Sequence, residues 1–372
     1  MPRRQHRDYS FESEDNEDET RSLGLSKRRR IKHHSRHSSV QAEQHGINTA
    51  GLPTFPDELL FEILSHLPTA PMPNAGYGPL DAECHIVRQQ SLLTLSLTCS
   101  NLRRFFRPYV WNRIEIISSK GRTSNLELLR QLEVVTVRDP SLAQYVEVVN
   151  VHVRDYSVVP VVEELARCIA IFPNLHSVKL QISFNPAERP FGYRSEVSKI
   201  FSSRSYPQIR SIFVSKSAYG LLASCPEVLE ARNLEVGRLD GWHFLRAISS
   251  CHRLENLEIA SNMSLQKFQE IPSNFPKVRT LVLHLFRSPH DFSEELECLS
   301  NLKHLSHLMI RAEWHTAEAR TYIVDWAKAL LLDLQRADGE EKYLQLTGQD
   351  WPKIEEVDII LPALKTISPI NN

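Results

Sequence analysis

The sequence has few cysteines and no paired ones, which excludes two classes of structural site. Its six cysteines are scattered along 372 residues, and no two of them form a Cys-x-x-Cys pair. Zinc ribbons and disulfide-stapled secreted domains both need cysteines that recur at short spacing. We therefore expect no zinc site and no disulfide framework. A chain of this kind is expected in a reducing compartment, the cytoplasm or the nucleus or both.

Glycine is also scarce, with 12 residues in the whole chain. The sequence contains no glycine-rich phosphate loop, no Gly-x-Ser-x-Gly elbow, no His-Glu-x-x-His motif and no kinase signature. It therefore indicates no catalytic residue, no cofactor and no enzymatic activity. The histidines His33, His34 and His37 lie close together but have no cysteine or carboxylate at ligand spacing, so no metal site is expected there.

Long apolar runs and an excess of either charge are missing as well. No run of about 18 apolar residues occurs, and the first residues are charged and polar, so we expect neither a membrane span nor a secretory signal. The 44 Lys and Arg residues nearly balance the 45 Asp and Glu residues, for a net charge of −1. This balance predicts no general affinity for nucleic acid.

The two ends of the chain are predicted to be tails. Residues 1–50 lack apolar periodicity and carry an acidic run at 12–19, so they cannot bury enough surface to offset the entropy of ordering. A short tail is also expected at 366–372. A basic run in the first tail resembles a nuclear-import signal. The alternative is a solvated tail that has no targeting function. The residues of this run are Lys27, Arg28, Arg29, Arg30 and Lys32.

The strongest helical signal lies at residues 52–68. Pro56 suits the first position of a helix, where its missing N–H is no loss. Asp57 and Glu58 then complement the positive end of the helix dipole. Apolar residues follow at spacings that place them on one face of the helix, and Pro68 ends it. These apolar residues are Leu59, Leu60, Ile63, Leu64 and Leu67.

A second leucine-rich block follows at residues 91–99 and leads into a segment that ends on Trp111. Between the two blocks, residues 71–79 are rich in proline and glycine and are expected to form a loop. Asp81 can then cap a helix that extends the second block toward the N-terminus. This helix is expected to run through Ile86, Gln90, Leu93 and Leu97.

These two blocks together resemble an F-box. The resemblance rests on the Pro-Asp-Glu-Leu-Leu start, the Ile-Leu-Ser-His-Leu end of the first helix, the leucine-rich second block with Cys99, and the closing Trp111. It covers residues 51–113, with an insertion at about 68–90 where the family has a handful of residues. The resemblance implies binding to a Skp-family adaptor and through it to a cullin. The residues that it assigns to the adaptor surface or its supporting core are Pro56, Leu59, Ile63, Leu64, Leu67, Leu92, Leu95 and Trp111.

After Trp111 a unit of the form aromatic-Pro-x-φ-x-x-φ-x-φ recurs, where φ is apolar. The last two apolar residues alternate and predict a short strand, and helical stretches such as 161–169 separate the units. The intervals scatter around the leucine-rich-repeat period of about 20–29 residues. Each unit leaves an apolar face that only its neighbours can cover, so the units must stack. The units begin at Phe172, Tyr206, Cys251, Phe275 and Trp351, with looser ones near 146, 225 and 305.

Residues 114–365 therefore resemble the irregular leucine-rich repeats that follow F-boxes, particularly in fungal proteins. The predicted fold class is α/β, with an N-terminal helical F-box followed by a leucine-rich-repeat-like α/β solenoid. A doubly wound α/β domain is the alternative. A helix around 314–335 and a strand at 354–359 are expected to form an enlarged capping unit. We expect laterally adjacent parallel strands that carry Val178, Ile212, Leu257, Leu281, Leu308 and Val357.

An F-box joined to a repeat domain is the layout of a substrate receptor. The resemblance implies a non-catalytic substrate-recognition subunit of an SCF (Skp–cullin–F-box) ubiquitin ligase, whose repeats bind an unknown protein substrate. One alternative is an F-box scaffold that acts outside the ligase. Another is an unrecognised α/β enzyme, which would show a deep pocket with paired titratable groups.

Overall fold

The computed structural model describes residues 55–72, 79–116, 121–154, 158–184, 193–234, 241–260, 265–285, 297–312, 317–338, 341–350 and 353–361. The predicted tails at 1–50 and 366–372, the import run at 27–32 and most of the predicted loop at 71–79 lie outside these residues. Among the described helices, none is both long and apolar enough to cross a bilayer.

Three helices open the described chain: α1 (Asp57–Ser65), α2 (Pro79–Thr98) and α3 (Ser100–Trp111). Asp57 and Glu58 lie in the first turn of α1, as predicted, but Pro56 is the residue before the helix and not its first residue. Helix α2 begins two residues before Asp81, which lies in its first turn. The N-terminal extension of the second helix is thus confirmed. Cys99 separates α2 from α3 and caps α3, because its Sγ accepts a hydrogen bond from the Leu102 N–H.

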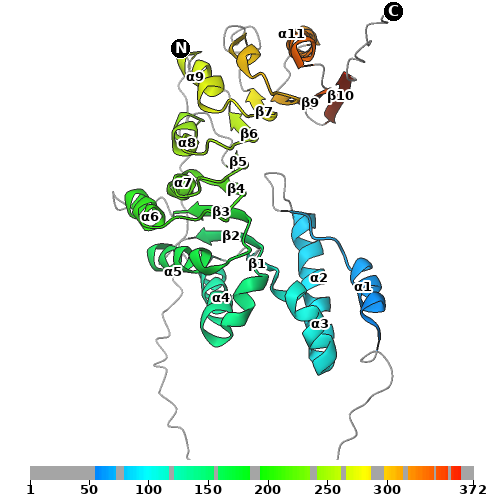
Figure 1. Cartoon of the computed structure of the whole chain (residues 1–372), viewed down its shortest axis with the longest axis vertical. Coiled ribbons are helices and arrows are strands. Elements are labelled where there is room, and N and C mark those ends of the chain that lie inside the picture. Colours follow the sequence, from blue (N-terminus) through cyan, green and yellow to red (C-terminus); the bar gives the residue numbers. More distant parts are fainter. Residues whose placement is uncertain are drawn as a thin grey trace, which may run out of the picture. The chain divides into compact units, whose positions relative to one another are not determined.

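The rest of the chain forms a sheet whose ten strands follow one another in sequence order (Figure 1). Strands β1 to β9 are parallel to their neighbours, and β10 is antiparallel to β9. The strands are β1 (Arg113–Ile116), β2 (Val148–Arg154), β3 (Ser177–Ser183), β4 (Ser211–Val214), β5 (Glu230–Asn233), β6 (Asn256–Ala260), β7 (Thr280–Leu285), β8 (His307–Ala312), β9 (Lys342–Asp350) and β10 (Lys353–Leu361).

Helical segments connect the parallel strands, and α5 to α9 line one side of the sheet, at the left of Figure 1. Their apolar residues form one continuous core with the strand residues that face them. The connecting segments are α4 (Gly121–Glu133), the π-turn η2 (Val134–Arg138), η3 (Pro140–Tyr145), α5 (Val158–Ile171), α6 (Tyr193–Ser202), η5 (Lys216–Ala218), α7 (Tyr219–Leu222), α8 (Gly241–Ile248), α9 (Leu265–Asn274), η7 (Cys298–Asn301) and α11 (Ala317–Asp338).

The strand register confirms most of the predicted adjacency of parallel strands. Five of the six residues expected on adjacent parallel strands occupy one row, which also contains Ala231 of β5 and Leu344 of β9. These five are Val178, Ile212, Leu257, Leu281 and Leu308, and each is buried. Five of the residues that begin the units are buried too, which places Phe172, Tyr206, Cys225, Cys251 and Phe275 in the core as turn-packing residues. Trp351 lies outside the described residues.

The prediction for Val357 was wrong, since β10 runs antiparallel to β9 and Val357 is the register partner of Leu346. Two residues separate β9 from β10 in the sequence. A parallel crossover needs a dozen or more residues, whereas a hairpin needs as few as two. The sequence analysis missed strand β9, because no aromatic-Pro pair precedes it. Without β9, the short connection that makes β10 antiparallel could not be recognised.

Candidate functional site

The three N-terminal helices pack around a small core of their own. It comprises five buried residues, namely Leu60, Leu92, Leu102, Phe106 and Val110. Half-buried side chains from all three helices surround this core, and Trp111 contacts both it and the larger core beneath the sheet. Helix α3 leads directly into β1, so the helices and the sheet belong to one compact unit.

The structure divides the predicted adaptor residues between core and surface. Leu92 is buried and supports the helices from inside. Ile63, Leu64, Leu67, Leu95 and Trp111 are half-buried against that core. Only Pro56 and Leu59 are exposed, and Leu59 leaves 48% of its surface open. Most of the predicted residues therefore pack against the core of the three helices, and only two of them are exposed for contact with an adaptor.

Exposed large apolar side chains are nevertheless concentrated in the part of the chain that contains α1 and α2. Of the 13 large hydrophobic residues that are exposed among the described residues, eight lie between positions 55 and 97. An apolar patch on a soluble protein commonly marks an interaction surface. The eight residues are Phe55, Leu59, Phe61, Met72, Ile86, Val87, Leu93 and Leu97.

Helix α2 carries part of this exposed set on a single stripe. Ile86, Leu93 and Leu97 recur at spacings of seven and four residues, and all three are exposed, Leu97 by 71%. The buried face of α2 includes His85 and Ser96, which are polar. The sequence pattern correctly predicted a helix through the apolar stripe, but that stripe points outward.

Polar contacts fix this helical segment to the first two strands. The Arg113 guanidinium on β1 donates hydrogen bonds to the carbonyls of Ala70 and Pro71 at 3.0 and 2.8 Å. It also pairs with Glu115 at 2.8 Å. Glu115 accepts a further hydrogen bond from Asn150 on β2 at 2.7 Å, and its carboxylate lies 3.5 Å from Nδ1 of His85 on α2. Because Arg113, Glu115 and His85 are buried, these contacts hold the helices and the sheet in a fixed arrangement.

Burial lowers the pKa of His85 below its usual value, although the Glu115 carboxylate opposes this shift and Arg113 adds to it. The unfolded chain therefore takes up a proton near the usual pKa of about 6.5, where the folded chain does not. We expect the free energy of unfolding to fall as the pH is lowered through that value. Urea denaturation between about pH 8 and pH 5 should show a smaller fall for His85→Asn than for the parent. An equal fall in both proteins would contradict this role for His85.

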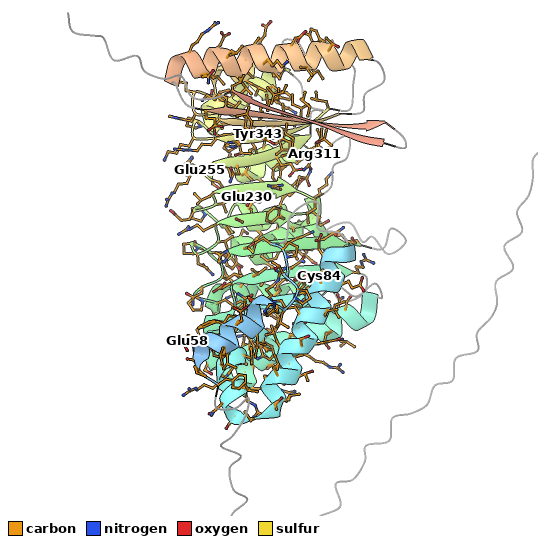
Figure 2. The ribbon with its side chains drawn as sticks, turned by 90° about the vertical axis from the view of Figure 1, so that its right-hand side faces the viewer. Glu58, Cys84, Glu230, Glu255, Arg311 and Tyr343 are labelled. Carbon is orange, nitrogen blue, oxygen red and sulfur yellow. The ribbon has the colours of Figure 1, made fainter. Side chains whose placement is uncertain are left out.

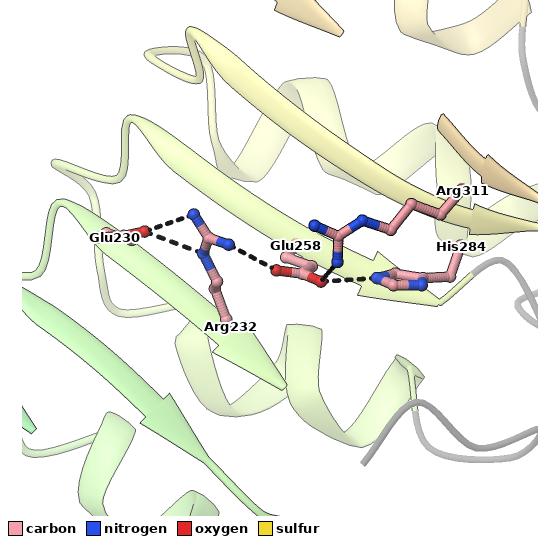
Figure 3. Close-up of polar contacts among 5 residues, drawn as sticks. All are labelled: Glu230, Arg232, Glu258, His284 and Arg311. Atoms are coloured by element: carbon pink, nitrogen blue, oxygen red, sulfur yellow. Dashed lines mark hydrogen bonds and ion pairs between the residues drawn. The ribbon is translucent and has the colours of Figure 1, made fainter. Parts of the chain in front are cut away.

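The sheet face opposite α5–α9 carries a second group of polar residues near its middle. Figure 2 views the molecule from this side, with Glu230 and Arg311 labelled on β5 and β8. Between them lies Glu258 on β6, whose side chain is buried. Figure 3 shows that Glu258 accepts hydrogen bonds from Arg232 at 3.0 Å, Arg311 at 3.0 Å and His284 at 2.6 Å. Arg232 also pairs with Glu230 at 2.8 Å.

This arrangement keeps Glu258 ionised. Burial by itself raises the pKa of the carboxyl, but the hydrogen bond from His284 and the charges of Arg232 and Arg311 together lower it below its usual value. A buried carboxylate is stable only when such partners surround it. The sequence analysis did not identify this cluster, because its members lie on four different strands and share no motif.

Potential metal ligands and two of the buried cysteines are candidate reactive groups among the described residues. They contain no group of three or more His, Cys, Asp or Glu residues placed to hold a metal. Burial raises the pKa of the Cys251 thiol to about 11 and that of Cys225 well above its usual value. Both thiols therefore remain protonated near neutral pH and are poor nucleophiles.

A cavity of about 400 Å³ adjoins the end of α1 and the start of β1 and β2. Its apolar lining includes Phe61, Leu64 and Met72, and its polar lining includes Arg88 and Glu147. It lies in the region where the helical segment meets the sheet, and the buried contacts of Arg113 border it.

No protein-family model and no curated protein sequence matches this chain. Its assignment to a function therefore depends on its own residues and their arrangement.

Proposed function

We propose that this chain is a substrate-recognition subunit of an SCF-type ubiquitin ligase. Helices α1 to α3 act as the F-box that binds a Skp-family adaptor, and the strands and helices that follow act as leucine-rich-repeat-like units that bind a protein substrate. The observation that carries the proposal is the concentration of exposed apolar side chains on residues 55–97. These residues belong to the same segment whose sequence resembles an F-box.

An adaptor surface of this kind needs apolar residues outside and a separate core inside. Leu59 on α1 and Leu93 and Leu97 on α2 are available for contact, while Leu60, Leu92 and Phe106 are not. Binding a partner would remove the exposed leucines from water, which supplies the main favourable free energy of association. The division between exposed and buried leucines thus supports the proposal.

The protein would carry out no bond chemistry in this role. Its contribution to ubiquitin transfer would be proximity, because a bound substrate presents its lysines at high effective concentration. Proximity requires that the substrate surface and the adaptor surface keep a fixed relation. The buried contacts of Arg113, Glu115 and His85 between the helices and the sheet support such a relation.

Affinity capture of the tagged full-length chain from cells with a blocked proteasome tests this function. We expect both a Skp-family adaptor and a cullin among the captured proteins. Capture of the adaptor without a cullin would favour a scaffold that acts outside the ligase, and capture of neither would contradict the proposal. We also propose that the protein acts in the nucleus, the cytoplasm or both, because its cysteines are scattered with no Cys-x-x-Cys motif and because of the basic run at 27–32.

A further inference from the structure

We propose that Arg232 and Arg311, held around Glu258, bind a carboxylate side chain of an acidic substrate peptide on the open face of the sheet, which is the face opposite α5–α9. This inference rests on the proposed function, since it names the class of substrate that the receptor takes. The observation behind it is that the buried carboxylate of Glu258, near the middle of this face, accepts hydrogen bonds from two arginines and a histidine on neighbouring strands (Figure 3).

Glu258 itself is not the binding group. Its residue is 1% exposed, and both of its oxygens are occupied. Oε2 accepts from Arg232, while Oε1 accepts from both Arg311 and His284. The carboxylate therefore serves to orient the three side chains that surround it.

The arginines remain accessible from solvent. The Arg311 side chain is 35% exposed and that of Arg232 is 23% exposed. In its contacts with the described residues, Arg311 uses Nη1 toward Glu258. A guanidinium has five N–H donors, and a pair of them can bind a carboxylate in a bidentate manner. Arg311 thus has donors left for a ligand while one contact fixes its position.

The surroundings of the cluster strengthen such a contact. Register places Phe213, Val282 and Met309 in the same row of the face as Arg232 and Glu258. Phe213 and Val282 are buried, and the Arg232 guanidinium lies over the Phe213 ring, 5.6 Å from its centroid. An apolar floor lowers the local dielectric constant and makes a charge-assisted hydrogen bond above it stronger than one in open water.

The balance of charge favours a carboxylate over a phosphate or a nucleic acid. The charges of Arg232 and Arg311 are matched by those of Glu258 and Glu230, so these four side chains carry no excess positive charge. A ligand carboxylate brings one negative charge to this balanced cluster, whereas a phosphate monoester brings about two, so the carboxylate is the less unfavourable of the two. A polyanion would need an extended basic surface, and the chain as a whole has a net charge of −1.

The test measures binding of a short fluorescein-labelled peptide that alternates serine with glutamate, by fluorescence anisotropy with the full-length protein. Low ionic strength is needed, because salt screens exposed charges. We expect Arg311→Gln to weaken binding roughly tenfold, since the variant loses the charge-assisted hydrogen bonds to the peptide carboxylate. Arg311→Lys should retain part of the affinity, because lysine keeps the charge but loses the planar fork.

Arg253→Gln provides the matched control. Arg253 is also an ion-paired surface arginine, with Glu227 as its partner, but it lies in the turn before β6 and not on the open face. We expect this variant to bind the peptide like the parent. Equal binding by Arg311→Gln and the parent, or an equal loss in Arg253→Gln, would overturn the proposal. Tighter binding of a phosphoserine peptide than of the glutamate peptide would overturn the choice of a carboxylate.

Adaptor capture by the same proteins separates this inference from the proposed function. Arg311→Gln should capture a Skp-family adaptor as well as the parent does, and its circular dichroism spectrum should match that of the parent, which shows that the sheet is folded. If the parent captures the adaptor but does not bind the glutamate peptide, the inference fails and the proposed function stands. If the peptide binds but no adaptor is captured, the proposed function fails and the peptide site remains.

Discussion

Replacing Leu59 and Leu97 by aspartate is expected to abolish capture of a Skp-family adaptor without unfolding the protein. The two side chains are 48% and 71% exposed, so neither change removes much packing from the core. Burial of a leucine in an interface contributes about 1.5–3 kcal/mol, and an ionised aspartate in its place must also lose its hydration. Each 1.4 kcal/mol changes an affinity tenfold, so the double variant should bind at least about a hundredfold more weakly. Pulldown with a purified adaptor measures this loss.

A control with the same chemistry at other positions makes the result specific. Ile171 at the end of α5 and Leu332 on α11 are exposed apolar residues outside the helical segment. Their replacement by aspartate introduces the same two charges and should leave capture unchanged. Parental capture by the Leu59 and Leu97 variant, with an unchanged circular dichroism spectrum, would contradict the assignment of this surface.

Phe106→Ala is expected to unfold helices α1 to α3 while the sheet stays folded. Phe106 is fully buried, and only four other buried residues share its core. A buried phenylalanine truncated to alanine costs about 3–5 kcal/mol, which is a large part of the stability of a small core. Hydrogen exchange should therefore become much faster in residues 57–111 and remain slow in β2 to β8.

Phe106→Leu tests whether this loss follows from the missing volume. Leucine refills most of the space in the same core, so it should cost much less and keep exchange in α1 to α3 slow. If Phe106→Ala left exchange in these helices unchanged, they would not depend on the small core, and the helical segment would have to be stabilised by its contacts with the sheet.

The parallel part of the sheet could be predicted from the sequence because each strand repeats the same relation between a buried turn residue and two inward apolar residues. Val178, Leu257 and Leu281 occupy equivalent positions for this reason. Strand β5 was recognised only as a loose unit, since Ala231 takes the place of a large apolar residue in the row. The direction of β10 depends on its short connection to β9, and no repeat pattern carries that information.

The candidate surface could be predicted only in part. An apolar stripe predicts a helix, but it does not say whether the stripe faces a core or a partner. On α2 the polar residue His85 is buried because it faces Glu115 on β1, and this leaves Leu93 and Leu97 outside. Ile63 was predicted together with Leu59 as an adaptor residue, yet it is half-buried against the core, so its replacement would also disturb folding.

The cluster around Glu258 could not be predicted from the sequence, because its residues are far apart in the chain. Arg232, Glu258, His284 and Arg311 occur at intervals of more than 25 residues, and only the parallel register brings them together. A charged residue at an outward strand position is ordinarily read as solvated surface. That two arginines and a histidine are directed at one buried carboxylate can be recognised only from the structure.

Hydrogen exchange of the full-length chain, with and without a purified Skp-family adaptor, tests the central claim most directly. If α1 and α2 form the adaptor surface, their backbone amides should exchange more slowly when the adaptor is bound, and the amides of β5 to β8 should be unaffected. Slower exchange confined to the strands, or no change in α1 and α2 at saturating adaptor, would contradict the proposal that this segment is an F-box.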